Sequence, residues 1–198
     1  ETSSDLEVIG FASEPKEALE KLKTLKPDVV TLDIHMPKMT GVEFLHKYKI
    51  QDKIPVVVVS ALSLNEGDSV LNALEMGAVD FIQKPQGADF NNIKNEIQDK
   101  IRAAAQTQGH SVLGRGSCKN DLNATNSIQA YSSDLTKSLV VIGASTGGTN
   151  ALPDLLELLP DNIPPILVVQ HIPKEFSGPF AERLNKKFAF EVKEAAQN

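Results

Sequence analysis

The sequence predicts an α/β protein with parallel sheets, organised as two successive domains. Short runs of β-branched residues alternate with helical patterns, and several of these runs end in a polar residue. This alternation is typical of βα units, in which each strand is followed by a helix that covers the sheet. A polar segment without a sustained apolar period divides the alternation, so we expect a domain over residues 1–103, a flexible linker over 104–136 and a second domain from 137 to 198.

Composition and charge narrow the possible partners. The chain has 198 residues, 41% hydrophobic and 23% charged, as in globular domains, and its net charge of −6 disfavours nucleic acid and anionic lipid. The single cysteine, Cys118, leaves no disulfide or cysteine-based zinc site and favours a reducing compartment. The longest apolar runs are far shorter than the ~18 residues of a membrane span. We expect a cytoplasmic protein without nucleic-acid partners or membrane insertion.

The first domain contains three strands that each lead into a polar residue. We expect strands over 28–32, 54–59 and 79–82, with helices between and after them. Ser13 is a possible N-cap of the first helix, and Pro27 ends it. Apolar residues at helical spacing mark three helices: Ala18, Leu22 and Leu25; Val70, Leu71 and Leu74, ended by Gly77; and Phe90, Ile93, Ile97 and Ile101.

The second domain repeats the alternation over a shorter length. Strands are expected over 139–143, 166–170 and 190–192. The helices between them are marked by Leu152, Leu155, Leu156 and Leu159, and by Phe176, Phe180 and Leu184. A sheet of this size should not close its core alone, so we expect that the domain continues beyond residue 198.

Three polar residues follow the strands of the first domain. Asp33, Ser60 and Lys84 lie at the carboxyl ends of predicted parallel strands, which is where open sheets of this kind bind ligands. A carboxylate, a hydroxyl and an ammonium group there suit phosphoryl chemistry, with Asp33 as nucleophile and the other two binding phosphoryl oxygens. The alternative is a structural ion pair between Asp33 and Lys84.

The surrounding motifs resemble those of the receiver domain of two-component response regulators. They are LDIHMPKMTG at 32–41, SA at 60–61 and FIQKP at 81–85. The resemblance covers nearly all of residues 6 to 103, and it implies a flavodoxin-like, doubly wound parallel sheet.

The resemblance also assigns roles to individual residues. It makes Asp33 the phosphoacceptor, Ser60 the switch hydroxyl, Phe81 the rotameric aromatic residue and Lys84 the phosphate-binding lysine. Asp33 and the backbone carbonyl of His35 become ligands of the Mg²⁺ ion that supports phosphorylation. A chemotaxis histidine kinase is the implied phosphodonor.

Two features depart from that family's pattern. Thr40 stands where the family usually has Asp, which we interpret as a turn variant beside Gly41. The chain also opens at what resembles the family's second strand, so the first strand, the first helix and the acidic pair that completes the Mg²⁺ site have no counterpart in it.

A glycine-rich turn follows the first strand of the second domain. The segment Gly143-Ala144-Ser145-Thr146-Gly147-Gly148 fits the G-x-S-x-G nucleophile elbow, which exposes a serine between a strand and a helix. The N–H groups at the helix start, including that of Thr146, could bind an oxyanion. A phosphate-binding loop is the alternative, but the segment lacks the lysine of a P-loop.

His171 ends the next strand, where it would face Ser145 across one strand spacing as a general base faces its nucleophile. Taken alone, a histidine in this position is more often packed at a sheet end than catalytic. A triad also needs a carboxylate, and Asp154, Glu157 and Asp161 are poorly placed for that role. We therefore expect the third triad member, an Asp, beyond residue 198.

The segments VVIGASTGG at 140–148 and VVQHIP at 168–173 resemble the catalytic domain of the chemotaxis protein-glutamate methylesterases. That family hydrolyses glutamate methyl esters on methyl-accepting chemoreceptors and deamidates receptor glutamines. The resemblance makes Ser145 the nucleophile, His171 the base and Thr146 a supporting residue, with no cofactor for ester hydrolysis. We expect a phosphorylation-regulated esterase, inactive as this fragment alone. The alternative is a phosphorelay receiver protein whose second domain docks partners without catalysis.

Overall fold

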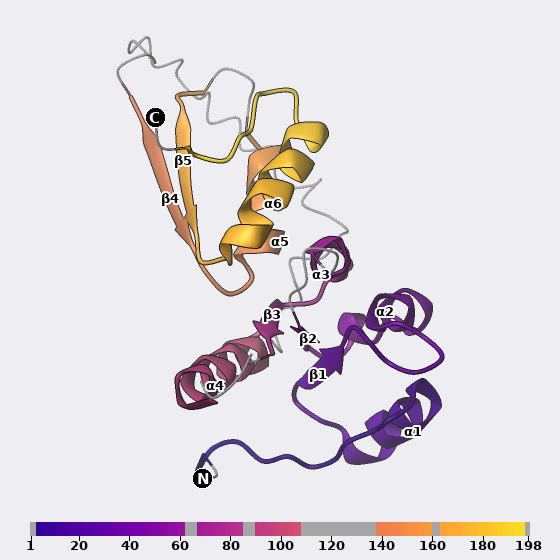
Figure 1. The fold of residues 1–198 in the computed structure, drawn as a ribbon. Helices are drawn as coiled ribbons and strands as arrows, with labels where there is room; N and C mark the ends of the chain where they lie inside the picture. Colours follow the sequence, from indigo (N-terminus) through magenta and orange to yellow (C-terminus); the bar gives the residue numbers. More distant parts are fainter. Residues whose placement is uncertain (1–2, 62–66, 85–89, 108–137, 160–162, 197–198) are drawn as a thin grey trace, which may run out of the picture.

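The computed structural model describes residues 3–61, 67–84, 90–107, 138–159 and 163–196. Strands and α-helices, β1 to β5 and α1 to α6, alternate along this part of the chain, and Figure 1 shows their arrangement. The strands are β1 (Val30–Asp33), β2 (Val56–Ser60), β3 (Asp80–Gln83), β4 (Val140–Ala144) and β5 (Ile166–Gln170). The helices are α1 (Pro15–Leu25), α2 (Gly41–Tyr48), the short 3-10 helix η1 (Ile50–Asp52), α3 (Gly67–Glu75), α4 (Phe90–Gln106), α5 (Gly148–Glu157) and α6 (Lys174–Lys187).

The first half forms a three-stranded parallel sheet in the order β1-β2-β3. Its central strand is buried on both faces, because Val56 and Val58 pack with α1, α2 and α3 whereas Val57 packs with Ile82 and α4. A sheet covered on both faces needs continuous apolar strands, which explains the unbroken valine run. The predicted parallel α/β fold is confirmed here.

The second half is a two-stranded parallel sheet, β4-β5, whose helices α5 and α6 follow its two strands. Leu152, Leu156 and Leu184 of these helices are buried. Val141 and Val169 on the strands remain 62% and 61% exposed. One face of this sheet is therefore apolar and open to solvent in the described part of the chain.

Several boundaries differ from the sequence-based expectation. The segment 190–192 forms no strand, since the Val192 N–H donates to Asn185 Oδ1 at 2.8 Å instead of to a neighbouring strand. The opening segment around residues 6–10 also pairs with no described strand, and Val8 is 89% exposed. Helix α1 takes Glu14 as its N-cap, one residue after Ser13. Helix α4 extends to Gln106, past the expected boundary at 103.

The two halves touch through helix α3, which lies against α5 and α6 (Figure 1). Phe176 of α6 is 1% exposed and belongs to the same core cluster as the first sheet. Its ring meets Phe81 edge-on, with the centroids 5.1 Å apart. The Asn150 side-chain amide of α5 donates to the Ala78 carbonyl at 2.8 Å. The halves thus share buried contacts as well as surface contacts.

No helix among the described residues combines the length and apolar character needed to cross a membrane. Most of the expected linker, residues 108–136, lies outside the described residues, as do Pro85 and Asp161.

Candidate functional site

The predicted phosphoryl site gathers at the carboxyl edge of the first sheet. Lys84 Nζ lies 2.5 Å from Asp33 Oδ2, and the His35 N–H donates to Asp33 Oδ1 at 3.0 Å. The Lys84 N–H also donates to the Ser60 carbonyl at 2.7 Å, which holds the lysine at the end of β2. The side chains of Asp33 and Lys84 are 36% and 40% exposed, so the pair is open to a small ligand.

The loop after β1 is shaped by two residues beside Asp33. A Cβ on Gly41 would lie 2.4 Å from the Asp33 carbonyl oxygen, so only glycine permits this close approach of α2 to the strand end. Thr40 forms a complete capping box: its Oγ1 accepts from the Glu43 N–H, and Glu43 Oε2 accepts from the Thr40 N–H.

Thr40 is therefore the N-cap of α2, a role that the turn interpretation missed. The Thr-x-x-Glu spacing before an apolar stretch was the sequence signal for it. The two bonds to the carboxylate from the Thr40 N–H and hydroxyl also lower the pKa of Glu43.

Ser60 and Phe81 lie deeper in the sheet. Ser60 is fully buried at the end of β2, and Phe81 on β3 is 3% exposed. The structure thus brings Asp33 and Lys84 into direct contact and keeps Ser60 at the same sheet edge. This ion pair is also what the structural alternative requires, so the geometry accommodates both interpretations.

Oxygen donors at this edge fit a hard cation. Mg²⁺ prefers oxygen ligands in octahedral geometry, and the Asp33 carboxylate and the His35 carbonyl are such donors. No group of three His, Cys, Asp or Glu side chains gathers in the described ranges. These two donors fit Mg²⁺ chemically but fill only part of its coordination shell.

Ser145 and His171 come together at the carboxyl edge of the second sheet. Ala144 pairs in register with Gln170, so the next residue on each strand is Ser145 and His171 respectively. The His171 N–H donates to the Ala144 carbonyl at 3.0 Å. Both residues are exposed and line a depression of about 550 Å³, and neither is packed into a core.

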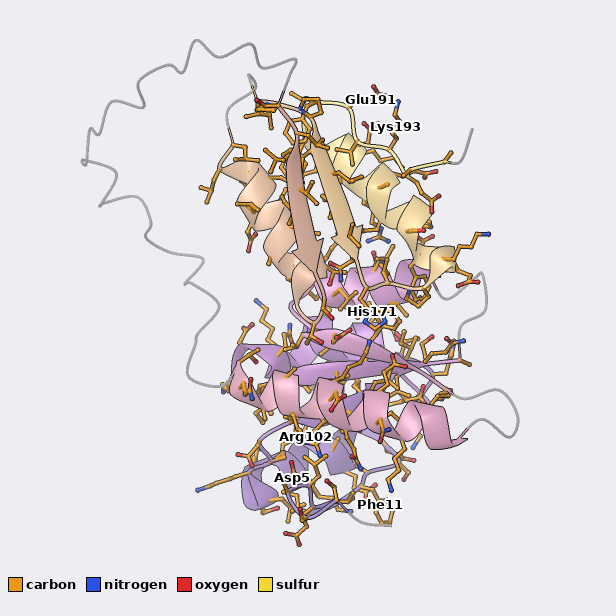
Figure 2. All side chains as sticks on the ribbon, turned by 90° about the vertical axis from the view of Figure 1, so that its left-hand side faces the viewer. Asp5, Phe11, Arg102, His171, Glu191 and Lys193 are labelled. Carbon is orange, nitrogen blue, oxygen red and sulfur yellow. The ribbon has the colours of Figure 1, made fainter. Side chains whose placement is uncertain are left out.

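This edge of the second sheet points toward the first half of the molecule. Figure 2 shows both strands of the second sheet running toward the first sheet, with His171 labelled at their junction. The contacts of Asn150 with Ala78 and of Phe176 with Phe81 lie in the same region. A substrate that reaches Ser145 therefore binds at the edge of the second sheet that faces the first domain.

The helix after Ser145 begins with a tight turn. The Gly148 N–H donates to the Ser145 carbonyl at 2.8 Å, and Thr146 occupies the turn, half-buried. The Thr146 N–H donates to no protein acceptor among the described residues. It is thus available for an oxyanion at the start of α5.

The two described carboxylates considered for the triad, Asp154 and Glu157, have no hydrogen bond or ion pair with His171. Asp154 and Glu157 are exposed on α5, and Glu157 instead pairs with Lys187 at 3.2 Å. Within the described ranges, the hydrogen bonds of His171 are made by its backbone, to Ala144 and Gln170, and none joins its imidazole to a carboxylate.

Two family models match the chain. The response regulator receiver domain matches residues 1–98, and the CheB methylesterase domain matches residues 140–198. The order of these two domains defines a class of protein, a response regulator with a receiver domain followed by a methylesterase domain.

Curated relatives match nearly the whole of this chain. The protein-glutamate methylesterase/protein-glutamine glutaminase 2 of Vibrio vulnificus (strain YJ016) is 45% identical over 195 residues, which are 97% of this chain and 54% of the relative. A protein of the same type from Nitrosomonas europaea is 42% identical, and the aligned region spans 96% of this chain and 54% of that relative. The chain spans about half the length of these relatives.

A solved structure, the response regulator domain of CheB from Thermotoga maritima, is 40% identical with a TM-score of 0.46, covering 52% of this chain and 80% of that one. From the domain and relative matches together, the chain belongs to the CheB family, the protein-glutamate methylesterases/protein-glutamine glutaminases.

Proposed function

We propose that the full-length protein hydrolyses glutamate methyl esters on chemoreceptors, and deamidates receptor glutamines, under control of phosphorylation at Asp33. The observation that carries the proposal is the placement of Ser145 and His171 directly after paired residues of adjacent parallel strands. A serine and a histidine exposed together at one sheet edge suit nucleophilic acyl transfer, whereas a docking surface has no need of them. The protein would act in the cytoplasm, on the receptors' cytoplasmic side.

The reaction proceeds in two halves. Ser145 Oγ attacks the ester carbonyl carbon while His171 accepts the hydroxyl proton. The Thr146 N–H donates to the oxyanion that forms. When the intermediate collapses, the bond from the acyl carbon to the methoxy oxygen breaks, and His171 returns the proton so that methanol leaves.

In the second half, His171 takes a proton from water and the resulting hydroxide attacks the acyl carbon. The bond to Ser145 Oγ then breaks and His171 returns its proton to the serine oxygen, which leaves the glutamic acid side chain; this acid releases its proton to solvent and becomes the carboxylate product. With a glutamine substrate the first leaving group is ammonia, and the second half is unchanged.

The receiver half would accept a phosphoryl group from a chemotaxis histidine kinase. Asp33 is the nucleophile, and Lys84, 2.5 Å from it, neutralises a phosphoryl oxygen. Mg²⁺, held by the Asp33 carboxylate and the His35 carbonyl, supplies charge neutralisation when bound. Ser60 and Phe81 link the phosphoryl group to the surface that meets the second domain, because Phe81 contacts Phe176.

The regulatory step follows from where Phe176 lies. It stands five residues after His171 along the chain, and helix α6 carries it into the core of the first domain. Movement of Phe81 on phosphorylation would release this contact and let the domains separate, which widens the approach of a receptor to the edge that holds Ser145. The contact between the halves therefore favours the unphosphorylated, docked form.

Methanol release from methylated receptors tests the catalytic proposal. Ser145→Ala and His171→Ala in the full-length protein should each lower the rate by ~10³-fold or more, because members of a catalytic unit act together. Half-buried Ser177 serves as a control, since Ser177→Ala removes a hydroxyl from α6 that is not in the depression. Turnover at the wild-type rate in the Ser145→Ala variant would favour the docking alternative.

A further inference from the structure

The side chain of Gln170 lies between the two residues assigned to catalysis. Its Nε2 donates to the Ser145 carbonyl at 3.0 Å and to the His171 carbonyl at 3.4 Å. Both acceptors are carbonyl oxygens, so only the amide nitrogen can face them, and this fixes the orientation of the amide. One side-chain amide thus bridges the backbone of the nucleophile and the backbone of the base.

The fold provides a space for this amide at the start of α5. A Cβ on Gly148 would lie 2.2 Å from Gln170 Oε1 and 3.0 Å from its Cδ, so the amide occupies the volume that a larger residue at 148 would take. Gln170 Oε1 is buried and has no hydrogen-bond partner in the described part of the chain. A buried, unpaired carbonyl is unfavourable, and the two bonds made by Nε2 offset that loss.

The Ser145 carbonyl is therefore held from two sides. It accepts from the Gly148 N–H of the helix and from Gln170 Nε2 of the strand β5. The strand bond between the His171 N–H and the Ala144 carbonyl connects the backbones one residue before Ser145. The Gln170 bond is the contact that ties this turn to β5.

We infer that Gln170 is a positioning residue that sets the distance and orientation of Ser145 relative to His171, in a space that Gly148 keeps open. This inference rests on the proposed function of Ser145 and His171. A displacement of about 1 Å between reacting groups is enough to lower a rate by ~10²-fold. The loss should therefore appear in kcat and not in substrate binding.

The variants are Gln170→Met, which keeps the length of the side chain without a donor, and Gln170→Glu, which keeps its shape. Gln51 provides a matched control, because its Nε2 also donates to a backbone carbonyl, that of Met76 at 3.1 Å, and its Oε1 is also buried without a partner. Gln51 lies in η1 of the first domain, outside the depression. Gln51→Met thus reports the structural effect of losing such an amide.

The experiment uses full-length protein and measures kcat and KM for methanol release, together with the rate at which a fluorophosphonate labels Ser145. Both Gln170 variants should lower kcat and the labelling rate by about tenfold or more, with KM changed less than twofold. Gln51→Met should leave these rates unchanged. Gly148→Ala, which fills the space of the amide, should resemble Gln170→Met.

A double variant separates positioning from general destabilisation. In the His171→Ala background, Gln170→Met should change the residual labelling rate less than twofold, because the geometry it maintains has already lost its base. Equal losses in both backgrounds would overturn the positioning role, and so would wild-type kcat in both Gln170 variants while Ser145→Ala is inactive. If wild-type protein neither releases methanol nor reacts with the reagent, the proposed function itself fails and this inference with it.

Discussion

Lys100 contacts both the backbone carbonyl and the ring of Phe81, and pairs with the neighbouring Asp80. Its Nζ donates to the Phe81 carbonyl at 2.7 Å and to Asp80 Oδ1 at 3.2 Å, and lies 4.8 Å from the centre of the Phe81 ring. Asp80 Oδ1 in turn accepts from the Phe81 N–H at 2.7 Å. The side chains of Lys100 and Asp80 are only 10% and 11% exposed. The aromatic residue at the domain contact is thus held by a buried ion pair.

Lys100→Met should destabilise the protein by about 3–5 kcal/mol, because it leaves the Asp80 carboxylate buried without its partner. Urea unfolding measures this change. Lys23→Met on the exposed face of α1 is the control and should change the unfolding free energy by less than about 0.5 kcal/mol. A Lys100→Met protein as stable as wild type would show that the pair contributes nothing net.

Asp33 is the residue that should carry the phosphoryl group. Full-length protein incubated with acetyl phosphate and Mg²⁺ should gain one phosphate, and Asp33→Asn should abolish this labelling because the amide is no longer a nucleophile. Asp52→Asn, in η1 and exposed, is a control that should retain it. Label that persists in Asp33→Asn would place the phosphoacceptor elsewhere and leave Asp33 and Lys84 as a structural pair.

At the scale of elements, the capping box decides where α2 begins. Thr40→Ala removes the side-chain acceptor of the Glu43 N–H and should lower the unfolding free energy by about 1 kcal/mol. Thr24→Ala is a suitable control, since its hydroxyl bonds only to carbonyls of its own helix. Chemical denaturation at pH 7 compares the two, and an equal effect would argue against the capping role.

The contribution of this capping box to the free energy of unfolding should depend on pH in a defined direction. The bonds that Glu43 accepts hold its pKa below the ordinary value of 4.5, so the carboxylate stabilises the fold above pH 4.5 and this contribution disappears as the pH falls through the folded-state pKa. The difference in unfolding free energy between wild type and Glu43→Gln should therefore shrink on acidification from pH 7. A difference that grows would contradict the assigned bonds.

At the scale of the whole molecule, Arg183 joins the two halves. This residue of α6 lies 3.1 Å from Asp68 Oδ1 and 2.9 Å from Glu75 Oε1, at the two ends of α3. Exposed ion pairs contribute about 0–1 kcal/mol each. Two such pairs are enough to shift the equilibrium between docked and separated domains several-fold.

Arg183→Ala should raise methanol release by unphosphorylated full-length protein about two- to fivefold and reduce the further gain on phosphorylation. Lys186→Ala, exposed on the same helix, should change neither rate. An unchanged basal rate in Arg183→Ala would show that this ion-pair contact does not limit access to Ser145.

The sequence alone identified the strands that position both sites. The spacing of apolar residues, the turn residues and the order of elements along the chain are local properties that can be read without the fold. Asp33, Ser60, Lys84, Ser145 and His171 were all predicted at strand ends, since parallel strands bring their carboxyl ends to one edge. The local pattern failed at 190–192, and the strand that the family resemblance implied for the opening segment is also absent among the described residues. A strand needs a hydrogen-bonded neighbour, and periodicity does not show whether one is present.

Tertiary structure alone decided which residues surround those strand ends. Three contacts follow from how helices α4, α5 and α6 pack. Phe176 packs against Phe81, Lys100 is buried beside Phe81, and the amide of Gln170 occupies the space above Gly148. Each of these contacts joins residues that are far apart in the chain or on different elements. No spacing in the sequence encodes such a contact, because it depends on packing across the whole fold.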